Sequence, residues 1–512
     1  MTMAPDEYDF IIAGGGTAGC IIARRLIQRT DARVLLLEAG PSYPPFLLDV
    51  PLLSTRLGYL LFSWRHQTTP QPGLGGRSVI LPMGKVVGGS SSIHAMISVV
   101  GFDRDLDAWA AAAGTTGWSA DELAAYIERA FDGPEASLGL QAPRYHSAFS
   151  EAFLEACEQN GLRRQEPLSS SVAGTCGYFP MLQKDGKRYS VTRGYIDDLA
   201  KHSRLTIRTG AHVRRVLIED GRAVGVEFTW RRRRRISRSR REVIVSLGAF
   251  GTPQILMCSG VGAADHLQAC GIPVHCDLPG VGRGLSDHLR APVLYRSGRT
   301  SPASLRRLPA AIARFLLHAD GLMTSNCCES GAFLSSQGGA VDLQLITHFQ
   351  SVHDARAVDL ECSLVRSHSR GTVELNQADP FGPTRIDPQY LSDERDTETM
   401  IDGILQIRDI AAEPALRKFP LYEETLPGTA IRSRAELGHY LRQHATTAYH
   451  PAGTCRMGTD EHAVVDHELR TRGIEGLRIA DASIMPTLPA GNTCCPVIMI
   501  AEKAADLIIA DP

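Results

Sequence analysis

The stretch Tyr8-Asp9-Phe10-Ile11-Ile12-Ala13-Gly14-Gly15-Gly16-Thr17-Ala18-Gly19 stands near the start of the chain and decides its fold. Residues 8–13 are apolar, aromatic and branched, as in a buried strand. Apolar residues then recur at helical spacing through residues 21–27, and residues 33–37 form a second apolar run that ends at Glu38. The order strand, glycine turn, helix, strand and acid predicts a Rossmann-like unit that binds a dinucleotide.

Each part of this unit has a physical task. Gly14 permits the tight turn, Gly16 lets the backbone approach a pyrophosphate, and Gly19 lets the helix pack closely on the strand. The free N–H groups at the start of the helix suit the phosphates. Glu38 can accept hydrogen bonds from both hydroxyls of a ribose, which disfavours NADP. The unit alone leaves FAD and NAD open.

The composition is that of a globular protein. Of 512 residues, 43% are hydrophobic and 21% charged, which excludes extensive disorder. The formal net charge is −2, so the chain as a whole is not biased toward nucleic acid or anionic membranes. No apolar stretch reaches the ~18 residues that span a bilayer, and the acidic start is unlike an export signal. We expect a cytoplasmic protein of more than one domain, with no membrane span and no nucleic-acid partner.

Two local features remain apart from the nucleotide unit. The twelve Cys include no Cys-x-x-Cys pair, so no zinc or redox motif and no metal site is expected. The vicinal pairs Cys327-Cys328 and Cys494-Cys495 are expected to be free thiols. An arginine tract, Arg231–Arg235 with Arg238, Arg240 and Arg241, lies between expected strands at 223–228 and 243–246. It is interpreted as the solvated tip of a hairpin, with an anion-binding patch as the alternative.

Further blocks follow the nucleotide unit in a recognisable order. They are Met83–Met96, Gly248–Leu256, His450–Gly458, Asp481–Pro486 and Gly491–Thr493. Together they resemble the glucose–methanol–choline (GMC) oxidoreductase family of FAD enzymes, from about Tyr8 to about Ile508. The resemblance implies FAD rather than NAD, and an alcohol-oxidising chemistry in most members.

The resemblance also implies the architecture. We expect an α/β protein, α+β overall, with a Rossmann-like FAD-binding domain and a separate substrate domain built on an antiparallel sheet. The FAD domain would comprise residues 1–145, 203–295 and 446–512. The substrate domain would comprise residues 146–202 and 296–445, with strands expected at 343–349 and 371–375.

Two residues carry the expected chemistry. His450 matches the catalytic His of the family, and an imidazole with a near-neutral pKa can take up a proton at working pH. Asn492 matches the second catalytic position, where an amide can hold the substrate oxygen without competing for its proton. The Asn resembles choline-type and hydroxymethylfurfural-type members, whereas His94 resembles aryl-alcohol oxidases. Trp64, Phe349 and Tyr449 could line the substrate cavity or simply pack.

The resemblance carries over a set of flavin contacts: Gly14, Gly16, Thr17, Ala18, Gly19, Glu38, Val87, Gly89, Ser90, His94, Ala95, Met96, Val213, Asp481, Ala482, Asn492 and Thr493. Ile93 stands where members with covalent flavin carry the attaching His, so FAD is expected to be non-covalent. Cys494-Cys495 replace the common Asn-Ala near the pyrimidine end of the flavin.

The expected function is that of an FAD-dependent, choline dehydrogenase-like alcohol oxidase or dehydrogenase, which oxidises a primary alcohol of aryl or otherwise activated type to the aldehyde. The alcohol would lose a proton to the protein and a hydride to flavin N5. Two alternatives stay open: a same-fold enzyme without net oxidation (cyanohydrin lyase or photodecarboxylase), and a flavin-binding protein without turnover. The electron acceptor, O2 or a quinone-like carrier, and the choice between monomer and dimer are open as well.

Overall fold

The computed structural model describes residues 6–133, 136–297, 308–349, 357–419 and 421–511. Its N-terminal unit follows the pattern of the sequence: β1 (Asp6–Ala13), α1 (Thr17–Arg29) and β2 (Val34–Glu38). β1 and β2 pair in parallel, with Phe10 opposite Val34 and Ala13 opposite Leu37. β2 is wholly buried and β1 is buried from Phe10 to Ala13, which explains their continuous apolar runs. The predicted strand, helix and strand are thus confirmed.

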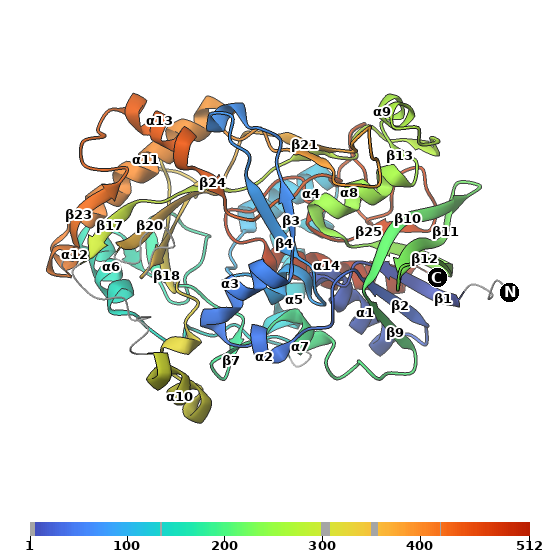
Figure 1. Cartoon of the computed structure of the whole chain (residues 1–512), viewed down its shortest axis with the longest axis horizontal. Helices are drawn as coiled ribbons and strands as arrows, with labels where there is room; N and C mark the ends of the chain where they lie inside the picture. Colours follow the sequence, from blue (N-terminus) through green and yellow to red (C-terminus); the bar gives the residue numbers. More distant parts are fainter. Residues whose placement is uncertain (1–5, 134–135, 298–307, 350–356, 420, 512) are drawn as a thin grey trace.

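A seven-stranded sheet grows from this unit at one end of the molecule (Figure 1). Its order is β10-β11-β12-β1-β2-β9, and β25 pairs with β12. The added strands are β9 (Leu205–Thr209), β10 (Ala211–Glu219), β11 (Arg222–Trp230), β12 (Arg233–Val245) and β25 (Leu477–Ile479). β9, β2, β1, β12 and β25 run in parallel, whereas β10, β11 and β12 form an antiparallel meander. This mixed sheet agrees with the expected Rossmann-like fold.

The arginine tract corrects one expectation. Only Arg231 and Arg232 form the hairpin tip, both with a positive φ (49° and 63°), and the rest of the tract continues as strand β12. The short strand expected at 243–246 is therefore the end of a 13-residue strand. Its arginines form ion pairs with acids of neighbouring strands: Arg234 with Glu227, Arg238 with Glu219 and Arg240 with Glu7. Much of the tract is thus compensated by local acids.

A nine-stranded sheet forms the other half of the molecule, with the order β23-β17-β20-β19-β18-β6-β5. The two remaining strands, β16 and β24, pair with each other, and β16 also pairs with β20. Every neighbouring pair is antiparallel except β5 with β6. The strands are β5 (Arg163–Arg164), β6 (Thr175–Tyr178), β16 (Leu289–Ala291), β17 (Leu294–Ser297), β18 (Ser330–Leu334), β19 (Leu343–His348), β20 (Ala357–Leu364), β23 (Leu421–Leu426) and β24 (Thr446–Thr447). The expected antiparallel sheet is confirmed, with the strand predicted at 343–349 as β19. The strand predicted at 371–375 forms as β21 (Gly371–Glu374), but it pairs with β15 (Arg283–Leu285) and β22 (Arg385–Asp387) in a separate three-stranded sheet, so its assignment to this sheet was wrong.

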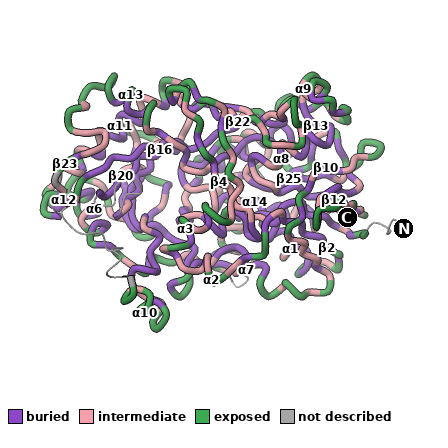
Figure 2. Tube along the Cα trace, viewed as in Figure 1, coloured by how far each residue is buried: buried purple, intermediate pink, exposed green. Residues whose placement is uncertain are grey.

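The buried hydrophobic side chains form two main clusters. Figure 2 marks the buried residues along the chain in purple. The helices that matter below are α3 (Pro51–Leu61), α6 (Ala148–Gln159), α7 (Val191–Tyr195), α8 (Gly248–Cys258), α11 (Glu394–Ala411), α13 (Arg434–His444) and α14 (Cys494–Ala510). One cluster includes Phe10, Ile22 and Ile498, and the other includes Phe153, Leu345 and Ile404. Two cores favour the two-domain division, which we retain as a proposal. Because β16 and β24 belong to the second sheet, we place its boundaries near residues 288 and 448.

A buried ion pair ties the C-terminal helix to the nucleotide unit. Arg25 of α1 donates to both carboxylate oxygens of Glu502 of α14, at 2.8 and 2.9 Å, and Tyr195 donates to Glu502 at 2.6 Å. Arg25 is 2% exposed and Glu502 is fully buried. Breaking one side of this contact would leave a buried charge without compensation. Among the described residues, no helix is long and apolar enough to cross a membrane.

Candidate active site

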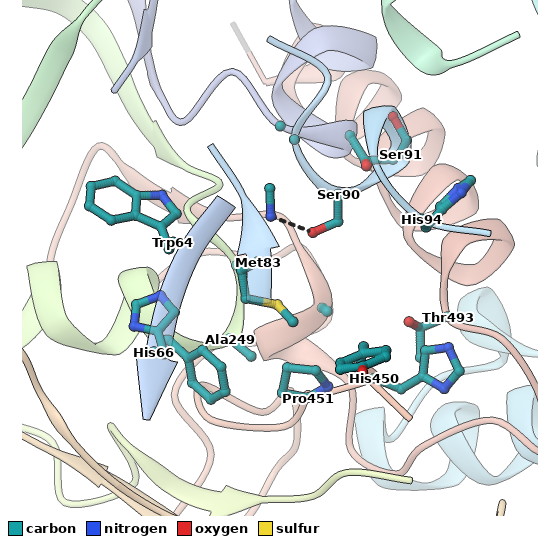
Figure 3. A pocket seen from close by; sticks show the side chains of 18 of the residues that line it. Trp64, His66, Met83, Ser90, Ser91, His94, Ala249, His450, Pro451 and Thr493 are labelled. Carbon is teal, nitrogen blue, oxygen red and sulfur yellow. Dashed lines mark hydrogen bonds between the residues drawn. The ribbon is translucent and has the colours of Figure 1, made fainter. Parts of the chain in front are cut away.

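A cavity of about 980 Å³ is lined by residues from both halves of the molecule. That volume is at the upper end of the roughly 300–1,000 Å³ typical of ligand pockets. Figure 3 shows side chains that reach it from β3 (Ser63–Gln67) and β4 (Ile80–Gly84), from the short helix η2 (Gly89–Ser92) and from the C-terminal part of the chain. The glycine turn and His450 thus face one common space.

The three glycines of the turn have different steric surroundings. A Cβ on Gly14 would lie 2.2 Å from the carbonyl oxygen of Ser246, and one on Gly19 would lie 2.0 Å from that of Gly14. Both glycines are therefore required by the protein's own packing. A Cβ on Gly16 would meet protein atoms only at 3.9 and 4.0 Å, yet Gly16 lines the cavity. The open space at Gly16 fits a phosphate-bearing ligand.

Glu38 is prepared to bind hydroxyl groups. Its carboxylate accepts from the backbone N–H of Gly15 (3.1 Å) and of Gly40 (2.7 Å), one on each oxygen. Burial raises its pKa to about 7, against the opposing effect of those donors. Each oxygen keeps a further lone pair that can accept from a ribose hydroxyl. Val213 also lines the cavity, from the edge strand β10, where backbone groups without a sheet partner can bind an adenine.

His94 is held through both ring nitrogens. Nδ1 accepts from the backbone N–H of Met96 (2.8 Å) and lies 3.2 Å from a guanidinium nitrogen of Arg188. Nδ1 is therefore the unprotonated nitrogen, and Nε2–H donates to Cys494 Sγ at 3.3 Å. Burial lowers the pKa of His94 to about 3, with the charge of Arg188 acting in the same direction. The ring is a neutral donor at physiological pH.

Other expected flavin contacts come from the C-terminal part of the chain. Asp481 accepts from Gly248 N (2.9 Å) and Thr252 Oγ1 (2.6 Å), so its carboxylate fixes the start of α8. Thr493 precedes α14, whose first turn offers backbone N–H groups and the positive end of the helix dipole. The cavity wall includes Gly14, Gly16, Thr17, Ala18, Glu38, Gly89, Ser90, His94, Ala95, Val213, Asp481, Ala482, Asn492 and Thr493. Three further expected residues, Gly19, Val87 and Met96, are buried and do not line the cavity, contrary to the prediction that they contact the flavin.

His450 is aimed by the residues around it. It follows β24 through Tyr449, whose φ of 68° turns the chain. The backbone N–H of His450 donates to Asp287 at 2.8 Å. The same carboxylate accepts from Thr447 Oγ1 and Tyr390 Oη, each at 2.6 Å. Asp287 thus fixes the backbone that carries the candidate base.

The hydrogen bonds of His450 indicate its tautomer. Gln344 Nε2 donates to Asn492 Oδ1 at 3.1 Å, which turns Asn492 Nδ2 toward His450 Nε2 at 3.4 Å. With that donor facing Nε2, the ring proton belongs on Nδ1, which lies 3.0 Å from Nδ1 of His288. Nε2 then carries the lone pair of the ring, which faces Asn492 Nδ2 at the cavity wall. Burial lowers the pKa of His450 to about 4, so the ring is neutral at pH 7 and free to accept a proton.

The structure adds cavity residues that the sequence did not single out. Besides Gln344 and His288, the second sheet contributes Arg290, His348, Asp359, Glu361 and Ser363 to the wall. The sequence contains an indication of three of these residues. Asp359, Glu361 and Ser363 alternate with apolar residues along β20, a pattern typical of a strand with one polar face. Trp64 and Tyr449 line the cavity, whereas Phe349 packs in the second core.

The cysteines are free thiols, as expected. All twelve are unpaired, including both vicinal pairs. Burial raises the pKa of Cys494 to about 12, so its thiol stays protonated. Ile93, at the position of the covalent attachment in other proteins, packs with Tyr43, Leu48 and Val86.

Comparison with known proteins matches this chain to one family over most of its length. Two family models described as GMC oxidoreductase match residues 8–290 and 367–501. An alcohol dehydrogenase (acceptor) of Pseudomonas putida is 37% identical, over 98% of this chain and 96% of that protein. The mitochondrial choline dehydrogenase of Mus musculus is 34% identical, over 100% and 91%. The crystal structure of pyridoxine 4-oxidase from Mesorbium loti superposes with a TM-score of 0.88 at 30% identity, covering 97% of this chain and 98% of that one.

Proposed function

The chain belongs to the GMC oxidoreductase family and acts on alcohols, and from that premise we propose that it oxidises a primary alcohol to the aldehyde with His450 as the base. The observation that carries this proposal is the neutral, half-buried His450 at the cavity wall, whose unprotonated Nε2 lies 3.4 Å from Asn492 Nδ2. A base near the alcohol oxygen is what the reaction needs, because the hydroxyl must lose its proton as the carbon loses hydride.

FAD is the cofactor that the residues fit. Gly16 leaves room for the pyrophosphate, Glu38 offers lone pairs for a ribose, and the start of α14 offers N–H groups to the polar edge of a flavin. When bound, FAD supplies the acceptor for the hydride. We propose that it is held without a covalent bond, since both nitrogens of His94 are engaged and an Ile occupies position 93.

The protein's part in the reaction is to place the alcohol and move one proton. Asn492 Nδ2, oriented by Gln344, can donate to the substrate oxygen while His450 Nε2 takes the hydroxyl proton. His288 accepts from His450 Nδ1 and keeps the proton off Nε2 before the reaction. As His450 becomes an imidazolium, the buried carboxylate of Glu361 favours its charge, and Arg290 opposes it. The positioned base favours oxidation over a cyanohydrin lyase, a photodecarboxylase or a flavin-binding protein without turnover.

The test is anaerobic reduction of the flavin by a panel of alcohols, including benzyl alcohol and choline. The flavin band should bleach with at least one alcohol, and subsequent mixing with O2 or with a quinone identifies the acceptor. In the variant His450→Ala, flavin should remain bound while the reduction rate falls by ~10²-fold or more, as for loss of a general base. A flavin that stays oxidised with every alcohol would refute the proposal, and an unchanged rate in the variant would remove His450 from the role of base.

A further inference from the structure

The second sheet presents a polar face to the cavity that the role of His450 does not explain. Side chains alternate along β20, so Asp359, Glu361 and Ser363 share one face. The register of β19 places His348 opposite Asp359 and Gln344 opposite Ser363. All five residues line the cavity. A charged wall in a largely buried sheet is costly, so each group needs a partner.

Glu361 has its partner within the protein. Arg290 forms an ion pair with it and also donates to the carbonyl of Thr447 (2.9 Å) and to Tyr449 Oη (3.1 Å). Burial alone would raise the pKa of Glu361, but Arg290 and His348 lower it to about 2. The pair Arg290–Glu361 is therefore neutral as a unit and saturated by protein groups.

Asp359 and His348 differ from Glu361 in their hydrogen bonding. Asp359 Oδ1 and His348 Nε2 are buried polar atoms without a hydrogen-bond partner among the described residues. Asp359 is 3% exposed, and His348 Nε2 lies 3.4 Å from Glu361 without hydrogen-bond geometry. Burial raises the pKa of Asp359 to about 7, while Glu361 raises that of His348 against the effect of burial. Both residues line the cavity, so a ligand there can supply the hydrogen bonds that Asp359 Oδ1 and His348 Nε2 lack.

The charge of the wall decides between kinds of ligand. A permanent cation would meet the guanidinium of Arg290 and the imidazole of His348, and the carboxylate of Glu361 is already paired with Arg290. A divalent metal could use His348, Asp359 and Glu361, whose ligand atoms lie within 4.8 Å of one another, but it would have to displace Arg290 from Glu361. A hydroxyl group both donates and accepts, and it is uncharged, so it matches an acceptor beside an imidazole.

We propose that the alcohol carries a second hydroxyl group, which Asp359 and His348 bind, so that the substrate class is a neutral diol or hydroxyl-substituted alcohol. This inference rests on the proposed oxidation of a primary alcohol. Glu361 and Arg290 are close enough for their charges to act on His450. Asp359, His348 and His450 line the same cavity, so the second hydroxyl belongs to the same small molecule as the reacting one.

The experiment compares matched alcohols by stopped-flow reduction of the flavin in the holoenzyme without oxygen. One set is 1-butanol with 1,2-, 1,3- and 1,4-butanediol, and the other is benzyl alcohol with 3- and 4-hydroxybenzyl alcohol. In at least one set, a hydroxylated member should exceed its parent at least tenfold in reduction rate divided by Kd. A buried site built to bind a hydroxyl discriminates strongly against the analogue that lacks it. Choline should be slower than that preferred alcohol.

Substitutions in the cavity wall test whether Asp359 and His348 cause the preference for the hydroxylated alcohol. Asp359→Ala and His348→Ala should each lower the ratio of hydroxylated alcohol to parent at least tenfold. A general loss of activity cancels in this ratio, and flavin bound per chain confirms folding. The matched control is Asp342→Ala, because the carboxylate of Asp342 accepts from the backbone and side chain of Ser336 and lies outside the cavity wall. The ratio should be unchanged in this control.

The outcomes separate this inference from the proposed function. If no alcohol reduces the flavin, the proposed oxidation fails. If alcohols reduce it but the parents match their hydroxylated partners, or choline is preferred, the second-hydroxyl site is refuted and the oxidation stands. Loss of the preference on adding EDTA, with its return on adding Zn²⁺, would also refute the site as proposed, in favour of a metal at His348, Asp359 and Glu361.

Discussion

The substitution Gly16→Ala separates the needs of the cofactor from those of the fold. Gly16 has φ −78°, which Ala adopts readily, and the new Cβ would meet protein atoms only at 3.9 and 4.0 Å. The free energy of unfolding of the apoprotein should therefore change by less than about 0.5 kcal/mol. The methyl group would instead project into the cavity where a pyrophosphate belongs. An overpacking cost of roughly 1–3 kcal/mol in the complex corresponds to a flavin affinity about 5- to 150-fold weaker.

Gly14→Ala is the matched contrast in the same turn. Its φ is 110°, and a Cβ would lie 2.2 Å from the carbonyl oxygen of Ser246. Left-handed strain of about 1–2 kcal/mol and overpacking of about 1–3 kcal/mol together predict a loss of roughly 2–5 kcal/mol in the stability of the apoprotein.

The assay for both variants is urea unfolding of the apoprotein, followed by titration with FAD monitored by quenching of flavin fluorescence. Gly16→Ala should unfold at the urea concentration of the parent and bind FAD weakly, whereas Gly14→Ala should unfold earlier. Equal FAD affinity of Gly16→Ala and the parent would refute the placement of the pyrophosphate at this turn. Equal stability of Gly14→Ala and the parent would refute the steric argument.

Four further expectations follow from the geometry. The rate of flavin reduction at saturating alcohol should be constant from about pH 5 to 8 and fall as the pH drops through about 4. His450 must be neutral to accept a proton, and burial lowers its pKa to about 4. A loss of rate centred near pH 6.5 would contradict this expectation. His288→Phe should lower the rate of flavin reduction at saturating alcohol at least ~10-fold while the protein retains its flavin. His288→Asn should restore part of that rate, because its side-chain oxygen can accept the hydrogen bond from His450 Nδ1. Equal rates in the parent and both variants would exclude a role of His288 in positioning His450. Glu502→Ala should lower the free energy of unfolding, measured by urea denaturation, by about 3–5 kcal/mol, because it removes the carboxylate that binds the buried Arg25. A loss below about 1 kcal/mol would show that the surrounding residues compensate for the missing carboxylate. Acid precipitation should release all the flavin into the supernatant if it is bound non-covalently. Yellow colour in the pellet would contradict the proposal that His94 forms no covalent bond with FAD.

Local sequence was informative wherever neighbours in the chain are also neighbours in space. The turn from Gly14 to Gly19 and the acid at Glu38 could be assigned functions because strand, turn and helix are set by adjacent residues. The order of later blocks extended this to the family and to the pair His450 and Asn492. The arginine tract shows the limit, since strand β12 continues through residues that composition alone suggested were a loop.

The proton path depends on contacts that no local pattern encodes. His288 and His450 are 162 positions apart and meet only because β16 and β24 pair in the second sheet. Gln344 orients Asn492 across 148 positions. The tautomer of the candidate base therefore follows from the packing of distant strands.

The sequence by itself determined which family this chain resembles, and it predicted a dinucleotide site and the two candidate catalytic residues. Those properties reside in short motifs whose geometry is set by backbone conformation and spacing. Only the tertiary structure decided what surrounds those residues: the pairing of His348 with Asp359, the saturation of Glu361 by Arg290, and the burial that keeps His450 neutral. The reason is physical, because strand register and desolvation arise from the packing of segments far apart in the chain, and charge states depend on that packing.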